Sequence, residues 1–169
     1  MRAFLVAATL AFSGLAYPQS DIALSYTGSK FPTFKLKTLD GKTISSQKLK
    51  GKVYIADFWA TWCGPCRRTI PILIEIKKKY KGKAFEVVGM DLSERMPKEG
   101  IQKFVSAMGM NYPVALQAES VARQIYAARL PTLYVVDKKG VVRFGESGMM
   151  YDPDGSKLSK LVGQLIAER

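Results

Sequence analysis

Two cysteines separated by two residues are the part of this sequence best suited to chemistry. Cys63-Gly64-Pro65-Cys66 follows an apolar run and precedes a segment with helical periodicity. At the N-terminus of a helix, free backbone N–H groups and the helix dipole favour the thiolate form of a cysteine. Thiolate is the attacking species in thiol–disulfide exchange. We therefore expect Cys63 to attack a disulfide and Cys66, one helical turn further on, to resolve the mixed disulfide.

The two residues between the cysteines suit this geometry. Gly64 permits a tight turn. Pro65 fixes φ for the first helical turn and has no N–H that needs a partner.

Asp57 is the candidate proton acceptor for Cys66. It lies within residues 53–60, a nearly continuous apolar run that is typical of a strand buried on both faces. Burial disfavours the charged form of a carboxyl, so we expect the pKa of Asp57 to be raised. The alternative is a partly exposed aspartate at the end of the strand, without a catalytic role.

The small number of cysteines and the lack of histidine exclude several classes of site. The chain has 2 cysteines and 0 histidines, too few ligands for a tetrahedral zinc site, and it lacks the base of a histidine-dependent triad. Arg67 stands where attachment of a c-type haem needs a histidine. We expect no metal and no cofactor, because the Cys63–Cys66 disulfide carries the redox chemistry.

Length and charge indicate one soluble domain. The chain has 169 residues, 47% of them hydrophobic, and its 26 basic and 14 acidic residues give a net charge of +12. The basic residues are dispersed, and the densest group, at positions 77–83, ends a predicted helix where lysines suit the dipole. A solvated face explains this group better than a polyanion site, and no nucleic-acid motif accompanies it.

The N-terminus has the pattern of an export signal. Residues 1–16 combine an early arginine with an apolar run and small residues before Tyr17. The alternatives are a membrane tether, if the segment is not cleaved, and an N-terminal core helix. We expect a signal peptide over residues 1–16, an irregular leader over 17–30 and one domain over 31–169, exported to a periplasmic or other extracytoplasmic compartment.

The order of the predicted elements indicates an α/β fold, a central mixed sheet flanked by helices. Ser156 can cap the last helix. Strands are expected around 34–44 (a hairpin at Asp40-Gly41), then over 53–60, 85–90, 112–116, 133–137 and 141–144; helices are expected after Cys66 and over about 97–108, 120–126 and from 156.

The residues from Asp57 to Cys66, read as DFWATWCGPC, resemble the signature of the thioredoxin superfamily. Pro71 matches the proline inside the family's active-site helix, and Leu130-Pro131-Thr132 matches the loop whose proline is cis in the family. Phe31-Pro32-Thr33-Phe34 and a central helix-and-strand insertion between about 90 and 116 resemble the exported TlpA/ResA-like branch. The likeness covers roughly residues 30–168.

This resemblance implies a thioredoxin fold with an N-terminal β-hairpin and the central insertion. It implies substrate contacts by Trp62, Gly64, Pro65, Leu130, Pro131 and Thr132, with the Leu130 backbone pairing with the substrate strand. Thr69 stands where many members of the exported branch carry glutamate. Val87 stands near the position of the lysine that partners the buried aspartate in many thioredoxins.

The expected function is reduction of protein disulfides, in cytochrome c maturation or thiol repair. The expected partners are protein disulfide or thiol substrates and an upstream electron-donor thiol protein, and a monomer is the default. One alternative is a thiol peroxidase of the peroxiredoxin type, although Ala60 stands where that family places threonine. The other is a non-catalytic interaction module.

Overall fold

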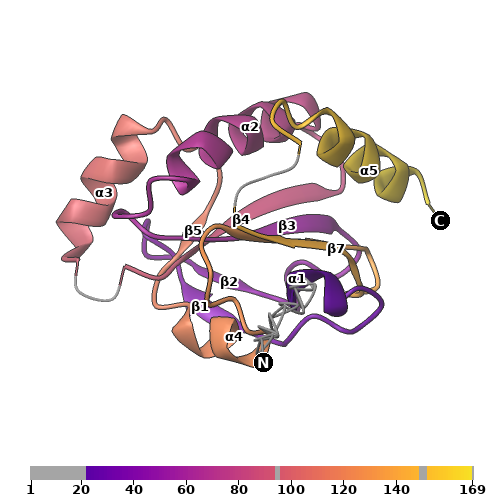
Figure 1. The fold of residues 1–169 in the computed structure, drawn as a ribbon, viewed down its shortest axis with the longest axis horizontal. Helices are drawn as coiled ribbons and strands as arrows, with labels where there is room; N and C mark the ends of the chain where they lie inside the picture. The colour runs from indigo at the N-terminus through magenta and orange to yellow at the C-terminus, as the bar shows by residue number, and fades with distance from the viewer. Residues whose placement is uncertain (1–21, 94–95, 149–151, 169) are drawn as a thin grey trace, which may run out of the picture.

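The computed structural model describes residues 22–93, 96–148 and 152–168, and it shows helices on both faces of a central sheet (Figure 1). The expected signal segment, residues 1–16, lies outside these residues. Most elements lie where the apolar pattern predicts them, with small shifts of their ends. In chain order they are α1 (Ile22–Ser25), β1 (Lys35–Lys37), β2 (Thr43–Ser45), β3 (Val53–Trp59), α2 (Cys66–Lys79), β4 (Phe85–Asp91), α3 (Lys98–Ala107), β5 (Val114–Ala115), α4 (Glu119–Gln124), β6 (Thr132–Val136), β7 (Val142–Ser147) and α5 (Ser156–Ala167).

The central sheet is mixed, as the sequence predicts. Its strand order is β5-β4-β3-β6-β7, and β1 and β2 form a separate two-stranded sheet. β3 pairs in parallel with β4 and antiparallel with β6. Because β3 is the central strand and ends at Trp59, just before the cysteines, the motif lies at the carboxyl edge of the sheet, where α/β folds place their chemistry.

Each face of the sheet has its own apolar layer. One lies under α2, α3 and α5 and includes Ile55, Trp59 and both cysteines. The other lies under α1, α4 and the β1–β2 hairpin and includes Tyr54 and Phe58. Alternate residues of a strand point to opposite faces, so Asp57 belongs to the layer that holds the cysteines.

The segment before the domain differs from the irregular leader expected over residues 17–30. Its described part forms α1 and then pairs with β7: the Gly28 N–H donates to the Val142 carbonyl over 2.8 Å, and the Val142 N–H donates to the Ser29 carbonyl over 2.9 Å. Gly145 permits this close approach, because a Cβ there would collide with the Ala23 carbonyl oxygen. A helix of 4 residues is too short to show helical periodicity, so the pattern does not predict it.

The cap of α5 also differs from the prediction. Ser156 is the first residue of the helix, after Gly155 with φ of 71°, and no side chain caps from the N-cap position. Two aspartates upstream accept the free N–H groups instead: Asp152 Oδ2 bonds the Leu158 N–H over 2.8 Å, and Asp154 Oδ1 bonds the Ser156 N–H over 3.0 Å. The predicted cap by Ser156 is therefore wrong.

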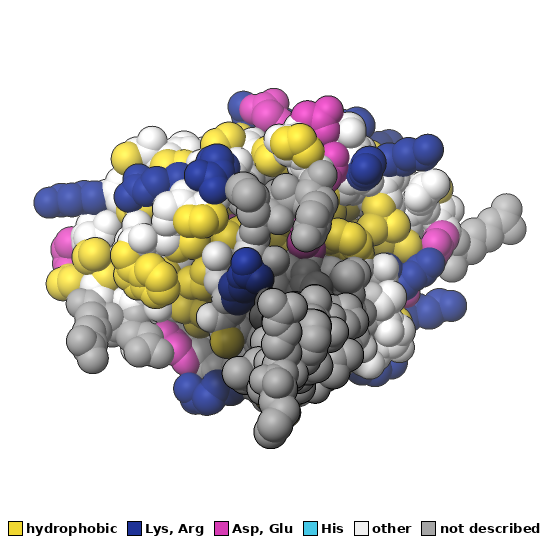
Figure 2. All heavy atoms as spheres, in the orientation of Figure 1, with side chains coloured by type: hydrophobic (Ala, Val, Ile, Leu, Met, Phe, Trp, Pro, Cys, Tyr) yellow, Lys and Arg dark blue, Asp and Glu magenta, His cyan; other side chains and the backbone are white. Residues whose placement is uncertain are grey.

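Basic side chains are spread over the face shown in Figure 2 and do not gather in one patch. Within the described ranges, no helix is long and apolar enough to span a membrane. The same residues contain no cluster of three or more potential metal ligands from His, Cys, Asp and Glu.

Candidate active site

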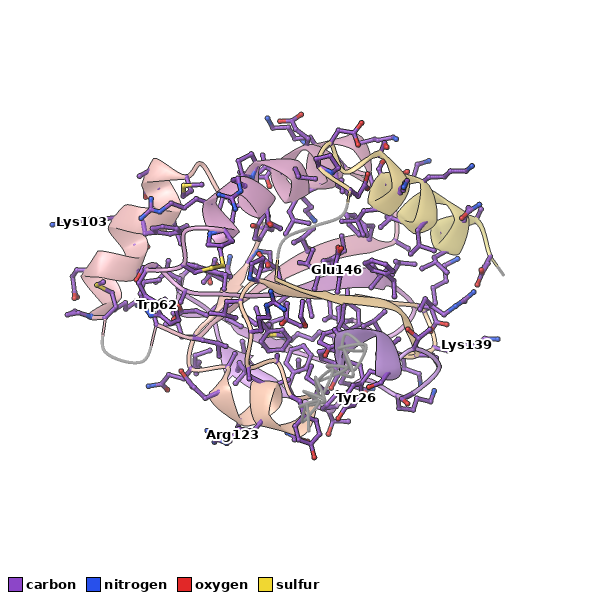
Figure 3. The ribbon with its side chains drawn as sticks, in the orientation of Figure 1. Tyr26, Trp62, Lys103, Arg123, Lys139 and Glu146 are labelled. Atoms are coloured by element: carbon purple, nitrogen blue, oxygen red, sulfur yellow. A yellow bond between two sulfur atoms is a disulfide. The ribbon has the colours of Figure 1, made fainter. Side chains whose placement is uncertain are left out.

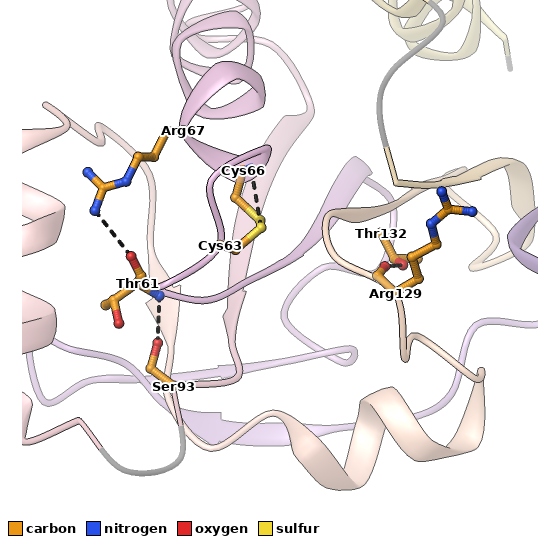
Figure 4. The surroundings of a disulfide bond; sticks show 7 residues. All are labelled: Thr61, Cys63, Cys66, Arg67, Ser93, Arg129 and Thr132. Carbon is orange, nitrogen blue, oxygen red and sulfur yellow. Dashed lines mark hydrogen bonds between the residues drawn. A yellow bond between two sulfur atoms is a disulfide. The ribbon is translucent and has the colours of Figure 1, made fainter.

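Cys63 and Cys66 form a disulfide at the start of α2 (Figure 4). Their Cα atoms are 5.4 Å apart, and the Cys66 N–H donates to Cys63 Sγ over 3.2 Å. This N–H is one of the free donors of the first helical turn, so in the reduced protein it is placed to stabilise a Cys63 thiolate. Cys63 is 4% exposed and Cys66 0%. An incoming disulfide therefore reaches Cys63 first.

Three residues that the resemblance assigns to substrate contact are exposed beside the pair. Trp62 is 73% exposed, and Gly64 and Pro65 are also exposed. In Figure 3, Trp62 lies on the side of the molecule that carries the disulfide, while Lys139 lies at the opposite end. A large apolar side chain so exposed beside a reactive pair is suited to contact with another protein.

Asp57 is fully buried, so the alternative of a partly exposed strand-end aspartate is wrong. The residue is 0% exposed, and burial raises the pKa of its carboxyl from 3.8 to about 7. Its partner across the parallel β3–β4 ladder is Gly89, while Val87 is paired with Ile55. Neither position supplies a cation, so β4 gives Asp57 no counterpart of the family's lysine.

The loop before β6 carries the predicted proline feature. The Leu130–Pro131 peptide bond is cis. The Pro131 carbonyl accepts the Gly148 N–H over 2.7 Å, and the Thr132 hydroxyl donates to the Arg129 carbonyl. Figure 4 shows Arg129 and Thr132 in the surroundings of the disulfide. The main-chain N–H and C=O of Leu130 have no hydrogen-bond partner among the described residues.

The structure adds a stack of side chains that sequence reasoning missed. The Phe104 ring of α3 stacks on Trp59, with centroids 5.0 Å apart and planes inclined by 16°. The Arg67 guanidinium lies 4.8 Å from the centre of the same ring, and its Nη2 donates to the Thr61 carbonyl over 3.2 Å (Figure 4). The central insertion thus contacts both the end of β3 and the first turn of α2.

Two further polar residues support the loop that leads to Cys63. The Thr61 N–H donates to Ser93 Oγ over 3.0 Å, and the Ser93 N–H donates to Asp91 Oδ1 over 3.1 Å. No motif signals Ser93, because only the pairing of β3 with β4 places it beside Thr61.

Thr69, which replaces the glutamate common in the exported branch, is buried in α2.

Comparison with known proteins agrees with this geometry. The Redoxin family matches residues 26–165. The thioredoxin-like protein YneN of Bacillus subtilis is 31% identical over 135 residues, which cover 79% of this chain and 78% of the relative. The thiol-disulfide oxidoreductase ResA of Bacillus thuringiensis is 34% identical over 116 residues, which cover 68% of this chain and 66% of the relative.

A solved structure shows the same fold. A thioredoxin-family thiol:disulfide interchange protein from Chlorobium tepidum superposes with a TM-score of 0.70 at 28% identity, covering 83% of this chain and 97% of the other. The match confirms the thioredoxin fold expected from the residues of the motif. The chain belongs to the Redoxin family, and it is a thiol–disulfide oxidoreductase.

Proposed function

We propose that this protein is an exported disulfide reductase that acts on protein disulfides through the Cys63–Cys66 dithiol. The observation that carries the proposal is the position of the pair, at the N-terminus of α2 and in the same layer as a buried carboxyl on β3. A nucleophile, a resolving thiol and a proton acceptor are the three groups that the reaction needs.

The first step uses Cys63. Its thiolate attacks one sulfur of the substrate disulfide, so that the substrate S–S bond breaks and a mixed disulfide forms. The released substrate sulfur leaves as a thiolate and takes a proton from water. The Cys66 N–H and the start of α2 stabilise the attacking thiolate.

The second step uses Cys66 and Asp57. The Asp57 carboxylate accepts the Cys66 proton, and the Cys66 thiolate attacks Cys63 Sγ. The enzyme disulfide forms, and the second substrate sulfur leaves and receives the proton that Asp57 holds. A carboxyl with a pKa of about 7 suits this exchange, because it can accept and return a proton near neutral pH. The substrate gains two electrons and two protons, and the enzyme dithiol becomes a disulfide.

Substrate docking uses the loop before β6. The Leu130 main chain, without a hydrogen-bond partner among the described residues, offers one N–H and one C=O to an extended substrate segment. Trp62, Gly64 and Pro65 provide the neighbouring contact surface, and Pro131 and Thr132 support the loop.

The remaining assignments follow from the sequence. The signal-like residues 1–16 support export, with membrane tethering only if this segment is not cleaved. The oxidised enzyme must be returned to its dithiol by an upstream thiol protein, because the chain has no other cysteines. We propose a monomer that needs no metal or other cofactor.

The test combines an activity assay with trapping. With dithiothreitol as the electron source, the parent protein should accelerate the reduction of insulin disulfides, and Cys63→Ser should abolish this acceleration. Cys66→Ser should instead accumulate mixed disulfides, whose substrates mass spectrometry can name. Unchanged insulin reduction by Cys63→Ser would falsify the nucleophile assignment.

A peroxide control separates the reductase from a peroxidase. We expect the reduced protein to lose its thiols slowly in hydrogen peroxide. Rapid loss, with a rate independent of any disulfide substrate, would contradict the reductase proposal.

A further inference from the structure

Two arginine side chains lie on opposite sides of the disulfide (Figure 4). They belong to Arg67 and Arg129, and both residues are exposed. Arg67 follows Cys66 in the first turn of α2, and Arg129 precedes Leu130 in the loop before β6. An extended substrate segment that pairs with Leu130 and brings its cysteine to Cys63 therefore lies between two positive charges.

Uncharged groups hold both guanidinium groups in place. The guanidinium of Arg67 lies 4.8 Å from the centre of the Phe104 ring and donates to the Thr61 carbonyl over 3.2 Å. The side chain of Arg129 lies against Gly148, where an added Cβ would be 2.9 Å from Arg129 Nε. An arginine has five N–H donors, so each guanidinium keeps donors for a further acceptor. Because each group is already positioned, it loses less side-chain entropy when it binds that acceptor.

The two arginines have no carboxylate partner among the residues that the structure describes. The ion pairs within these residues involve other cations, and neither Arg67 nor Arg129 belongs to one. The carboxyls that β3, β4 and β7 carry near this edge of the sheet, those of Asp57, Asp91 and Glu146, are 0%, 3% and 7% exposed. A docking partner therefore meets the two cations without an exposed carboxylate from these strands, on a chain whose net charge is +12.

We propose that Arg67 and Arg129 determine substrate specificity, by selecting protein disulfides whose cysteine has a carboxylate side chain before it and another after it. In an extended segment, the second residue on either side of the cysteine points to the same face as the cysteine, so one carboxylate can approach each arginine. A guanidinium binds a carboxylate through charge-assisted, often bidentate hydrogen bonds. Opposite charges also speed the encounter of two proteins. This inference rests on the proposed function and names the substrate class that the reductase prefers.

The test compares three peptides with one cysteine each, supplied as symmetrical disulfides. Glutamate, glutamine or lysine occupies the second position on both sides of the cysteine, and the sequences are otherwise identical. Acid quenching and chromatography give the rate constant for reduction by the dithiol protein, divided by that for dithiothreitol to correct for the reactivity of each peptide. We expect the corrected rate to be about tenfold higher for the glutamate peptide than for the glutamine peptide, and lowest for the lysine peptide. Equal corrected rates would overturn the inference.

Variants assign the preference to the two arginines. Arg67→Gln and Arg129→Gln should each lower the ratio of the glutamate rate to the glutamine rate by about threefold, whereas Arg67→Lys and Arg129→Lys keep the charge and should keep most of this ratio. Arg123→Gln is the matched control, because Arg123 is also exposed but lies on α4, over the other face of the sheet (Figure 3). An equal fall in Arg123→Gln, or in the lysine variants, would overturn the inference.

Salt and insulin separate this inference from the proposed function. Raising the salt concentration from about 0.05 M to about 0.5 M should reduce the preference for the glutamate peptide, because salt screens exposed charges. A preference that does not change with salt would contradict an electrostatic origin. If insulin is reduced but the three peptides react at equal corrected rates, this inference fails and the proposed function stands. If neither insulin nor any peptide is reduced, both fail.

Discussion

The guanidinium carbon of Arg67 lies 4.8 Å from the centre of the Phe104 ring, so the first turn of α2 stacks on a side chain of α3. The same ring stacks on Trp59 at the end of β3. Phe104 is therefore the residue through which the central insertion holds both the helix and the strand that flank the cysteines.

Replacing this ring should destabilise the protein. We expect Phe104→Ala to lower the free energy of unfolding by about 3 kcal/mol, because it removes a buried aromatic side chain and leaves a cavity. Phe104→Leu fills most of the space but cannot stack, so it should cost less. Urea denaturation at constant pH measures both. A negligible loss in Phe104→Leu would mean that the stack contributes nothing beyond volume.

Asp57 should make stability fall as pH rises. Burial raises the pKa of its carboxyl from 3.8 to about 7, so between these values the folded protein holds a proton that the unfolded chain has lost. Stability then decreases with increasing pH across this window, by on the order of 1 kcal/mol per pH unit. Asp57→Asn is neutral at every pH, so it should be more stable than the parent at pH near 8 and lose that advantage toward pH 4.

Urea unfolding of the oxidised protein over this pH range tests the prediction. Asp40→Asn is the control, because Asp40 is exposed and paired with Lys42 at 2.9 Å. We expect that variant to be no more stable than the parent protein above pH 7. A gain from Asp40→Asn equal to that from Asp57→Asn would indicate a general charge effect.

Gly89 should tolerate no side chain. In Gly89→Ala the new Cβ would lie 2.8 Å from Trp59 Nε1 and 3.4 Å from Met110 Cε. We expect this overpacking to lower the free energy of unfolding by about 2 kcal/mol and to shift the tryptophan emission. Gly64→Ala, where no atom lies within 4 Å of the new Cβ, should leave stability nearly unchanged. Equal stability of both variants would refute the close packing around Gly89.

The cap of α5 provides a fourth test. Asp152→Ala should lower the free energy of unfolding by about 1 kcal/mol, because the Asp152 carboxylate accepts the Leu158 N–H in the first turn. Ser156→Ala should cost less, because the Ser156 side chain does not cap the helix. Thermal unfolding of the two variants shows which residue caps the helix. A larger loss of stability from Ser156→Ala would support Ser156 as the cap and contradict the assignment to Asp152.

The sequence predicted the parts of the fold that local pattern determines. The continuous apolar run over 53–60 predicted the buried central strand, and the helical spacing after Cys66 predicted α2. The burial of Asp57 followed from its place within that run. In each case the signal lies within a few neighbouring residues, so one sequence is enough to read it.

The parts that the sequence did not predict depend on contacts between distant segments. Tyr112 is one aromatic residue in a short extended stretch, and only the pairing of β4 with β5 places it over Gly89. Phe104 fits the apolar periodicity of α3, but the pattern does not say that Trp59 and Arg67 share its ring. Ser156 and Asp152 are both good caps by residue type, and the backbone at Gly155 decides between them.

Residues 28–39 pair with both outer strands of the central sheet, and this pairing bears on solubility. At the β7 edge, Gly28 and Ser29 form main-chain hydrogen bonds with Val142. At the β5 edge, the Leu39 N–H donates to the Val114 carbonyl of β5, and the Leu116 N–H donates to the Lys37 carbonyl of β1. The outer strands of an open sheet are templates for pairing with a second chain. A single passage of the N-terminal segment therefore shields both borders of the sheet from aggregation, and a version trimmed to begin at Phe31 would uncover the β7 border.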